Sequence, residues 1–355
     1  MDSRKIQSVG SGTYTVSLPK DWVESQDIAK GDLVNLHPYI DGVLALQVQE
    51  HEGDPSTRVV ARVDHDEAEP LERTLRAAYA VGATEVMLEA TEQFTTDQRQ
   101  VVSRVTRTLA GVSVVEESDS MLRVRTLLDT AEVSVRQSVR QLTFVALSMH
   151  RDAMAAVTGD IAPTNLSNRD DQADRLYAMI DRSLALGLAR LDEVDALGVT
   201  RPELFELWAT TRELERVADH AEGIVTAATE IDDAVDESIA DEICALARLA
   251  REITSDAVSV IVDDTDIETA HQALNARDQI RDESTTVERG VRASSNGGPQ
   301  LRLVLDKIRR TAEHGGNIAE LGLRHEIRHG AFTEPMQEAE STDDPEQDPH
   351  ASTGG

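Results

Sequence analysis

Two pairs of acidic residues have the spacing that brings carboxylates together on one face of a helix. Glu215 and Asp219 are four positions apart, and Asp170 and Asp174 repeat this spacing in the preceding helical run. Residues four apart lie about one turn from each other on the same face. Four carboxylates presented by two antiparallel helices repel one another unless they bind protons or cations. An oxygen-only site suits Mg²⁺, Mn²⁺ or iron, whereas the alternative is a pair of solvated acidic faces.

The segment around the second acid pair occurs twice. Residues 214–224 return at a constant offset as residues 308–318, and each copy carries a histidine, His220 or His314, at the same place. Such a repeat indicates duplicated helical units packed together. Each histidine follows an acid directly and therefore points about 100° away from it around the helix. A packing or hydrogen-bonding role is favoured over metal ligation.

The second copy lacks most of these acids. In a gap-free alignment, three arginines stand opposite acids of the first half: Arg277, Arg281 and Arg309. Only Glu313 still matches an acid, so this half is expected to form Arg–carboxylate pairs or to bind an anion. Asp278 and Asp282 are also four apart, so other alignments remain open.

Motifs of the common catalytic and nucleotide-binding classes are absent. The sequence has no His-Glu-x-x-His, no Walker glycine loop and no Gly-x-Ser-x-Gly. Di-iron carboxylate proteins use Glu-x-x-His, but Ala218 stands three residues after Glu215 and Ala173 three residues after Asp170. We therefore expect no enzymatic activity.

The composition is strongly acidic. The chain has 66 acidic and 35 basic residues, a net charge of −31, and only four lysines. Concentrated salt screens such self-repulsion, which favours a halophilic protein over an ordinary acidic one. A single cysteine, Cys244, excludes an internal disulfide and suggests a reducing compartment. Without a run of about 18 uncharged apolar residues, we expect a cytoplasmic protein with no membrane insertion.

Basic residues are concentrated near the N-terminus. Three of the four lysines fall in the first thirty residues: Lys5, Lys20 and Lys30. Arg4 adjoins the first of them, and Ser11 and Thr13 add hydrogen-bonding hydroxyls. Such a set suits DNA phosphates, although solubilising charges beside nearby acids are the alternative.

Hydrophobic periodicity divides the first 130 residues into two units. In residues 1–50 we expect strands over 5–9, 14–18, 33–36 and 43–48 and a helix over 20–26. This unit is too short to bury a core alone, so it should dimerise. Residues 54–130 read as a small α/β or α+β segment with a structural or dimer-contact role. Its expected strands cover 58–63, 84–89, 112–115 and 122–126, and its helices cover 69–81 and 95–110.

Only helices are expected from residue 132 to residue 328. Six runs fit a helical period: 132–159, 168–190, 202–231, 236–263, 267–292 and 299–328. The linkers are short, which predicts two tandem three-helix bundles over 132–231 and 235–328. Residues 330–355 form an acidic tail that we expect to be disordered. The predicted fold class is therefore mainly α, with a small β-rich domain and an α/β segment ahead of the bundles.

Residues 132–328 resemble the PhoU family. The resemblance is carried by residues 214–224 and 308–318, the repeated segments, and by residues 168–176. It implies regulation of phosphate uptake together with the Pst phosphate transporter, whose ATPase subunit is the expected partner. It also implies a metal cluster, divalent or iron, on acid-x-x-x-acid pairs, here Asp170 with Asp174 and Glu215 with Asp219. The arginines of the second half depart from this pattern.

Residues 4–48 resemble the AbrB/MazE/SpoVT swapped-hairpin domain. The matching runs are 4–7, 15–20 and 31–34. That family forms an intertwined dimer whose strands and first loop meet DNA, which implies DNA contacts for five residues: Arg4, Lys5, Ser11, Thr13 and Lys20. Its combination with a PhoU-like region resembles archaeal phosphate-uptake regulators.

The leading hypothesis is a homodimeric transcriptional regulator of phosphate uptake. The N-terminal unit would bind DNA, and the helical region would sense phosphate status. One alternative is an adaptor that docks on the transporter ATPase without binding DNA. A metal-dependent oxidase or phosphatase is the third reading.

Overall fold

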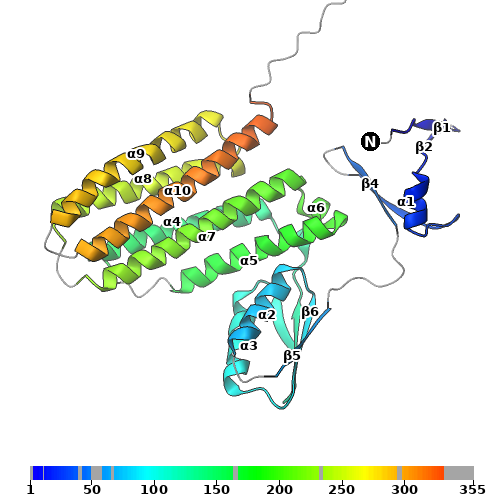
Figure 1. The fold of residues 1–355 in the computed structure, drawn as a ribbon, viewed down its shortest axis with the longest axis horizontal. Coiled ribbons are helices and arrows are strands. Elements are labelled where there is room, and N and C mark those ends of the chain that lie inside the picture. The colour runs from blue at the N-terminus through cyan, green and yellow to red at the C-terminus, as the bar shows by residue number, and fades with distance from the viewer. Residues whose placement is uncertain are drawn as a thin grey trace, which may run out of the picture.

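The computed structural model describes residues 3–10, 12–38, 42–48, 58–64, 68–162, 167–231, 235–293 and 298–331. Three units follow one another along the chain: a small β-rich unit, a four-stranded sheet with two helices, and an array of long helices (Figure 1). The predicted, mainly helical fold class is confirmed. Ser11 and the tail residues 332–355 lie outside the described residues.

The N-terminal unit consists of two antiparallel hairpins and one helix: β1 (Gln7–Val9) with β2 (Thr13–Thr15), β3 (Val34–Pro38) with β4 (Leu44–Val48), and α1 (Lys20–Ser25). None of its described side chains is buried. Large apolar side chains are instead open to solvent, among them Ile6 at 73%, Tyr14 at 75% and Leu36 at 58% exposure. In the described residues this unit has no core of its own.

The second unit is a mixed sheet with two helices. Its elements are β5 (Arg58–Val63), α2 (Glu69–Ala80), β6 (Glu85–Ala90), α3 (Thr96–Thr108), β7 (Val112–Glu117) and β8 (Met121–Thr126). The strand order is β5-β6-β8-β7, with β5 parallel to β6 and the other pairs antiparallel. Leu75 of α2 and Val105 of α3 pack with Leu88 and Leu122 of the sheet in one buried cluster.

The helical array contains the six predicted long helices: α4 (Val135–Val157), α5 (Ser167–Ala189), α7 (Arg201–Thr229), α8 (Glu237–Val262), α9 (Ile267–Ala293) and α10 (Gly298–Arg328). A short helix, α6 (Leu191–Leu197), and a 3₁₀ turn, η1 (Thr130–Glu132), were not predicted. Among the described side chains of helix α6, the buried apolar ones are Val194 and Leu197, which is too short a pattern to show a helical period. In the described part of the chain, no helix is both long and apolar enough to cross a bilayer.

The two bundles share one hydrophobic core. Buried residues of α4 and α7 belong to the same cluster as those of α8 and α10. Helix α10 contacts α7 as well as its own bundle partners α8 and α9 (Figure 1). Close approach of α10 to α8 depends on Gly315, because a Cβ there would come within 2.8 Å of Ile253 and 2.9 Å of Thr254. The duplicated halves therefore form one packed body.

A buried charged pair also joins α7 to α10. Glu206 accepts a hydrogen bond from Nδ1 of His325 at 2.9 Å, and Arg328 forms an ion pair with the same carboxylate. Glu206 and His325 are each only 2% exposed. Burial alone would raise the pKa of Glu206, but the bonds from His325 and Arg328 outweigh it and lower that pKa. The bond to Glu206 correspondingly raises the pKa of His325.

The sheet unit docks on the helical array through one buried arginine. The guanidinium of Arg182 on α5 donates to the carbonyl oxygens of Tyr79, Gly82 and Ala83 at 2.8, 3.1 and 3.0 Å. These carbonyls lie at and just beyond the end of α2, where a helix leaves its last acceptors without partners and favours a cation. Burial raises the pKa of the Tyr79 hydroxyl to about 12. Arg182 therefore fixes the sheet unit against α5.

We predict that Arg182→Met loosens this docking. The substitution keeps the aliphatic stem but leaves three carbonyls without their charged donor, so unfolding free energy should fall by about 3 kcal/mol. Arg175→Met is the matched control, because Arg175 also reaches from α5 to the sheet unit, through a single exposed bond to the carbonyl of Arg107. Urea unfolding and hydrogen exchange at the end of α2 measure both variants. Equal losses in the two would contradict a special role for Arg182.

Candidate functional site

The two predicted acid pairs lie close together on adjacent helices. Asp170 and Asp174 belong to α5, and Glu215 and Asp219 belong to α7, which packs against α5. The charges of Asp174 and Asp219 both act on Asp170, and the same two charges act on Glu215. The structure thus gathers all four carboxyl groups into one electrostatic cluster.

Crowding and burial keep these carboxyl groups from ionising easily. Burial, followed by the charges of neighbouring acids, raises the pKa of Asp170 to about 7. Burial and the charges of Asp219 and Asp174 raise the pKa of Glu215 to about 7 as well. The pKa values of Asp174 and Asp219 are also raised by burial, in part offset by Arg76 and Arg216 respectively. The cluster therefore resists full ionisation, because the surrounding cations do not compensate the negative charge that it would then carry.

A fifth acid, Glu222, belongs to this cluster and was missed from the sequence. It shares a hydrogen bond with Asp170, and its pKa is raised by burial and by the charge of Asp219. Glu215, Asp219 and Glu222 have i, i+4, i+7 spacing, so a helical-wheel count extended by one turn would have placed all three on one face.

The sheet unit forms one wall beside the cluster. A cavity of about 580 Å³ lies between α2 and the α5–α7 pair, and its lining includes Asp174 and Glu215 on one side and Arg76 on the other. The charge of Arg76 acts on Asp174. No local pattern in the sequence predicts this neighbour, because α2 precedes α5 by almost a hundred residues.

The atoms of the cluster are of a kind that binds cations, but their arrangement in this structure is not that of a formed site. Its ligand atoms are carboxylate oxygens, which Mg²⁺, Mn²⁺ and iron accept. Among the described residues, however, no three His, Cys, Asp or Glu side chains converge as a ready-made ligand set. Binding would therefore require side-chain rearrangement within the cluster.

The second bundle has ion pairs at the corresponding place. Arg281 contacts Glu313 at 2.7 Å, and Arg309 contacts Glu288 at 2.8 Å. Arg277 lies 3.4 Å from a carboxylate oxygen of Glu320. These are the Arg–carboxylate pairs expected from the aligned arginines, so the acid cluster of the first bundle is not repeated at these described positions of the second.

The bundle that carries the acid pairs is the part of the chain that matches a known protein family. Residues 139–228 match the PhoU domain. The PhoU-like segment includes most of α4, all of α5, and α7 except for Thr229, its last residue. The N-terminal unit and the sheet unit lie outside this segment. A role in regulating phosphate uptake fits a PhoU-like domain.

Two solved structures are similar to part of the chain. PhoU from Pseudomonas aeruginosa is 17% identical with a TM-score of 0.48, covering 55% of this chain and 96% of that one. The phosphate transport system regulatory protein PhoU from Streptococcus pneumoniae is 15% identical with a TM-score of 0.44, covering 57% and 96%. No curated protein matches the chain.

The repeated histidines meet where the PhoU-like bundle contacts the second bundle. Their Nε2 atoms, in His220 and His314, are 3.1 Å apart. Nδ1 of His314 lies 2.7 Å from Glu213, which also accepts from Asn317 at 2.9 Å. Burial lowers the pKa of His220 to about 4, so this ring is neutral near pH 7. The histidines thus have the hydrogen-bonding role that their place beside the acids predicted.

The predicted DNA-contact residues that are described lie on the surface of the N-terminal unit. Arg4 and Lys5 precede β1, Thr13 begins β2, and Lys20 begins α1; all four are exposed. Lys20 also pairs with Glu24 at 3.3 Å.

We predict that neutralising the acid cluster stabilises the metal-free protein at alkaline pH. The pKa values of Asp170 and Glu215 are raised above those of the unfolded chain, so ionisation costs stability as the pH rises from about 4 to about 7. Asp170→Asn combined with Glu215→Gln should add about 1 kcal/mol at about pH 8, allowing for solvent screening. Near pH 4 it should add little.

Thermal unfolding in a chelator measures this difference. The control is Asp241→Asn combined with Glu242→Gln, which removes two exposed acids from α8. A gain in the control as large as in the cluster variant would show that net charge alone is responsible.

Proposed function

We propose that the protein is a dimeric transcriptional regulator of phosphate uptake. The observation that carries this proposal is the match of residues 139–228 to the PhoU domain. In the proposal, the helical array senses phosphate status and the N-terminal unit binds DNA. No enzymatic step is proposed.

The exposure of the N-terminal unit supports its dimerisation. None of its described side chains is buried, although Ile6, Tyr14 and Leu36 are large and apolar. Exposed apolar surface on a unit this small is unfavourable in water and marks a surface that a partner covers. A second copy of the same hairpins would bury it, as the swapped-hairpin resemblance implies.

The charge of the same unit supports DNA as its ligand. Arg4 and Lys5 lie side by side ahead of β1, and Lys20 begins α1, in a chain whose net charge is −31. Two copies would double this set of cations on one assembly, which suits a phosphate backbone. At high salt the counterion-release contribution weakens, so base contacts and shape must supply more of the affinity.

The acid cluster is the proposed sensory element of the PhoU-like domain. Asp170, Asp174, Glu215 and Asp219 would hold a divalent or iron cluster, with Glu222 beside them. A bound cation would relieve the mutual repulsion of the carboxylates and stabilise their ionised forms. The ATPase subunit of the phosphate transporter is the proposed protein partner of the helical array.

We predict that DNA binding depends on Arg4 and Lys5. Fluorescence anisotropy in molar KCl should show tighter binding to promoter DNA of the organism's phosphate-transport genes than to a scrambled duplex. Arg4→Glu combined with Lys5→Glu should weaken binding at least about tenfold, because each lost phosphate contact reduces affinity and each new acid repels the backbone.

The matched control for this variant reverses two exposed arginines far from the N-terminus. Arg73→Glu on α2 combined with Arg310→Glu on α10 changes the net charge equally and should leave DNA affinity almost unchanged.

The dimer is tested separately: light scattering should give twice the chain mass of 38.8 kDa. No preference for the promoter over scrambled DNA would reject the regulator, and the adaptor that docks on the transporter ATPase would replace it.

We predict that divalent cations stabilise the protein through the acid cluster. At about pH 8, Mn²⁺ or Mg²⁺ at 100 times its dissociation constant should add about 2.7 kcal/mol to the free energy of unfolding. Asp170→Asn combined with Glu215→Gln should abolish this gain, whereas the α8 control variant should retain it. Thermal unfolding measures the gain in the unsubstituted protein and in both variants. An equal gain in all three would show that the cation binds outside the acid cluster.

A further inference from the structure

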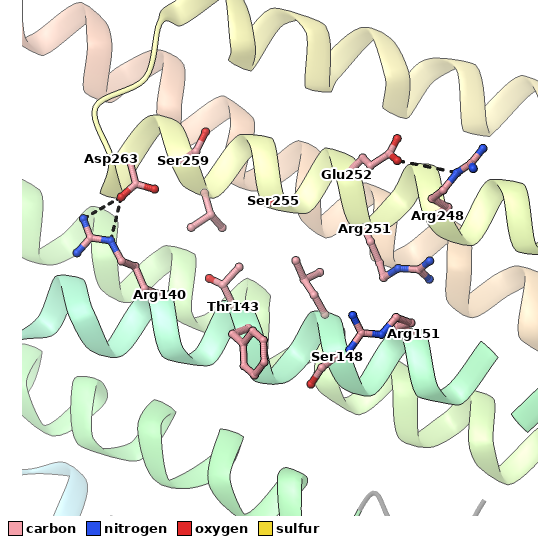
Figure 2. Close-up of a pocket in the computed structure, with 13 residues that line it drawn as sticks. Arg140, Thr143, Ser148, Arg151, Arg248, Arg251, Glu252, Ser255, Ser259 and Asp263 are labelled. Carbon is pink, nitrogen blue, oxygen red and sulfur yellow. Dashed lines mark hydrogen bonds and ion pairs between the residues drawn. The ribbon is translucent and has the colours of Figure 1, made fainter. Parts of the chain in front are cut away.

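A groove between α4 and α8 is separate from the acid cluster. It encloses about 530 Å³, a volume typical of small-molecule sites (Figure 2). The helices are antiparallel here, since Arg140 on α4 pairs with Asp263 at the end of α8, at 2.8 Å. Small side chains, Ser148 on α4 and Ser255 on α8, line its middle and leave the space open.

Three arginines gather at the end of the groove away from this ion pair. Arg151, Arg248 and Arg251 all line the cavity, and Figure 2 shows them at the same end. The pKa of Arg251 is lowered by burial and by the charges of Arg151 and Arg248, and the charge of Glu252, which also lines the groove, opposes this only in part. Like charges so close together are unfavourable unless an anion lies between them.

Nearby carboxylates compensate these arginines poorly. Arg151 lies 3.7 Å from Asp152, and Arg248 lies 3.9 Å from Glu252, at the limit of an ion pair. Within the described residues, Arg251 has no carboxylate within 4.0 Å. In a chain with a net charge of −31, such a positive cluster departs strongly from the average surface.

A neutral histidine holds Arg251 in place from the core. Nη1 of Arg251 lies 3.3 Å from Nδ1 of His150, a fully buried ring. Burial, followed by the charge of Arg251, lowers the pKa of His150 to about 3, so Nδ1 accepts the bond from the guanidinium. This bond fixes the guanidinium without neutralising its charge, which leaves the arginine ready for an anion.

The rest of the groove is lined by three apolar side chains as well as by polar ones, among them Thr143 and Ser259. Phe144 is 72% exposed although it is aromatic, and Leu147 and Val258 line the same space. The groove therefore offers a cationic end and an apolar wall with an open ring face, separated by serine side chains. A ligand that matches both must carry a multiply charged anionic group and a flat or apolar body.

We propose that this groove binds a nucleoside phosphate. Its phosphates would pair with Arg151, Arg248 and Arg251, and its base would lie against Phe144. Arginine forks match phosphate oxygens in pairs, and three of them suit more than one negative charge. Inorganic phosphate would leave the apolar wall uncovered. This site goes beyond the proposed DNA and metal functions.

Isothermal titration calorimetry of the full-length protein with ATP, inorganic phosphate and a glutamate-rich peptide tests the proposal. ATP should bind, and inorganic phosphate should bind at least about tenfold more weakly. Arg248→Gln should weaken ATP binding about tenfold through the loss of a charged contact, and Ser255→Trp should abolish it by filling the groove. Binding should weaken between 0.2 and 2 M KCl, by the screening expected of exposed charges.

Arg310→Gln on α10 is the matched control, since it removes one exposed arginine outside the groove. Arg248 and Ser255 are exposed, so these variants should fold, and circular dichroism checks this. ATP affinity that Ser255→Trp leaves unchanged would overturn the site, as would an absence of ATP binding. Inorganic phosphate binding as tightly as ATP, or the acidic peptide binding in preference to it, would overturn the ligand class.

Discussion

The contact between α7 and α10 is the interaction on which the rest of the helical array depends. It joins the two copies of the repeat into one core. It also buries polar groups of one copy whose hydrogen-bond partners belong to the other copy. Glu206 of α7 needs His325 of α10, and His220 needs its repeat partner His314. Leaving one charge of a buried pair alone costs about 3–5 kcal/mol, so the halves cannot separate without a large loss of stability.

The two halves of the helical array differ in the charges that they carry at related positions of the repeat. The first bundle presents acids whose repulsion is only partly compensated, whereas the second has Arg–carboxylate pairs at the related positions. Docking of the sheet unit adds to this asymmetry. Arg182 fixes α2 against α5. Because Arg76 belongs to α2, this docking also places Arg76 near Asp174. The sheet unit is thus a structural neighbour of the acid cluster, although its own sequence carries no recognisable motif.

Two places in the fold concentrate charge of one sign. The acid cluster lies between α5 and α7, and the arginine cluster lies between α4 and α8. The acid cluster costs stability in the absence of a ligand, because partial burial strengthens repulsion between like charges. Helix α4 packs against α5 and α7, which carry the acids, and also against α8, with which it forms the groove.

The sequence by itself determined the elements and the faces of the helices. Periodicity and turn residues located all six long helices and the strands of the sheet, and i, i+4 spacing put each acid pair on one face, because these properties depend on neighbours along the chain. The short helix α6 was not predicted, because the two side chains described as buried in it are too few to show a helical period. Tertiary structure alone decided which faces meet. The shared core, the bond between Asp170 and Glu222, the approach of Arg76 and the groove lined by Arg251 all join segments from different elements. Such contacts depend on side-chain packing in three dimensions, which no local pattern encodes.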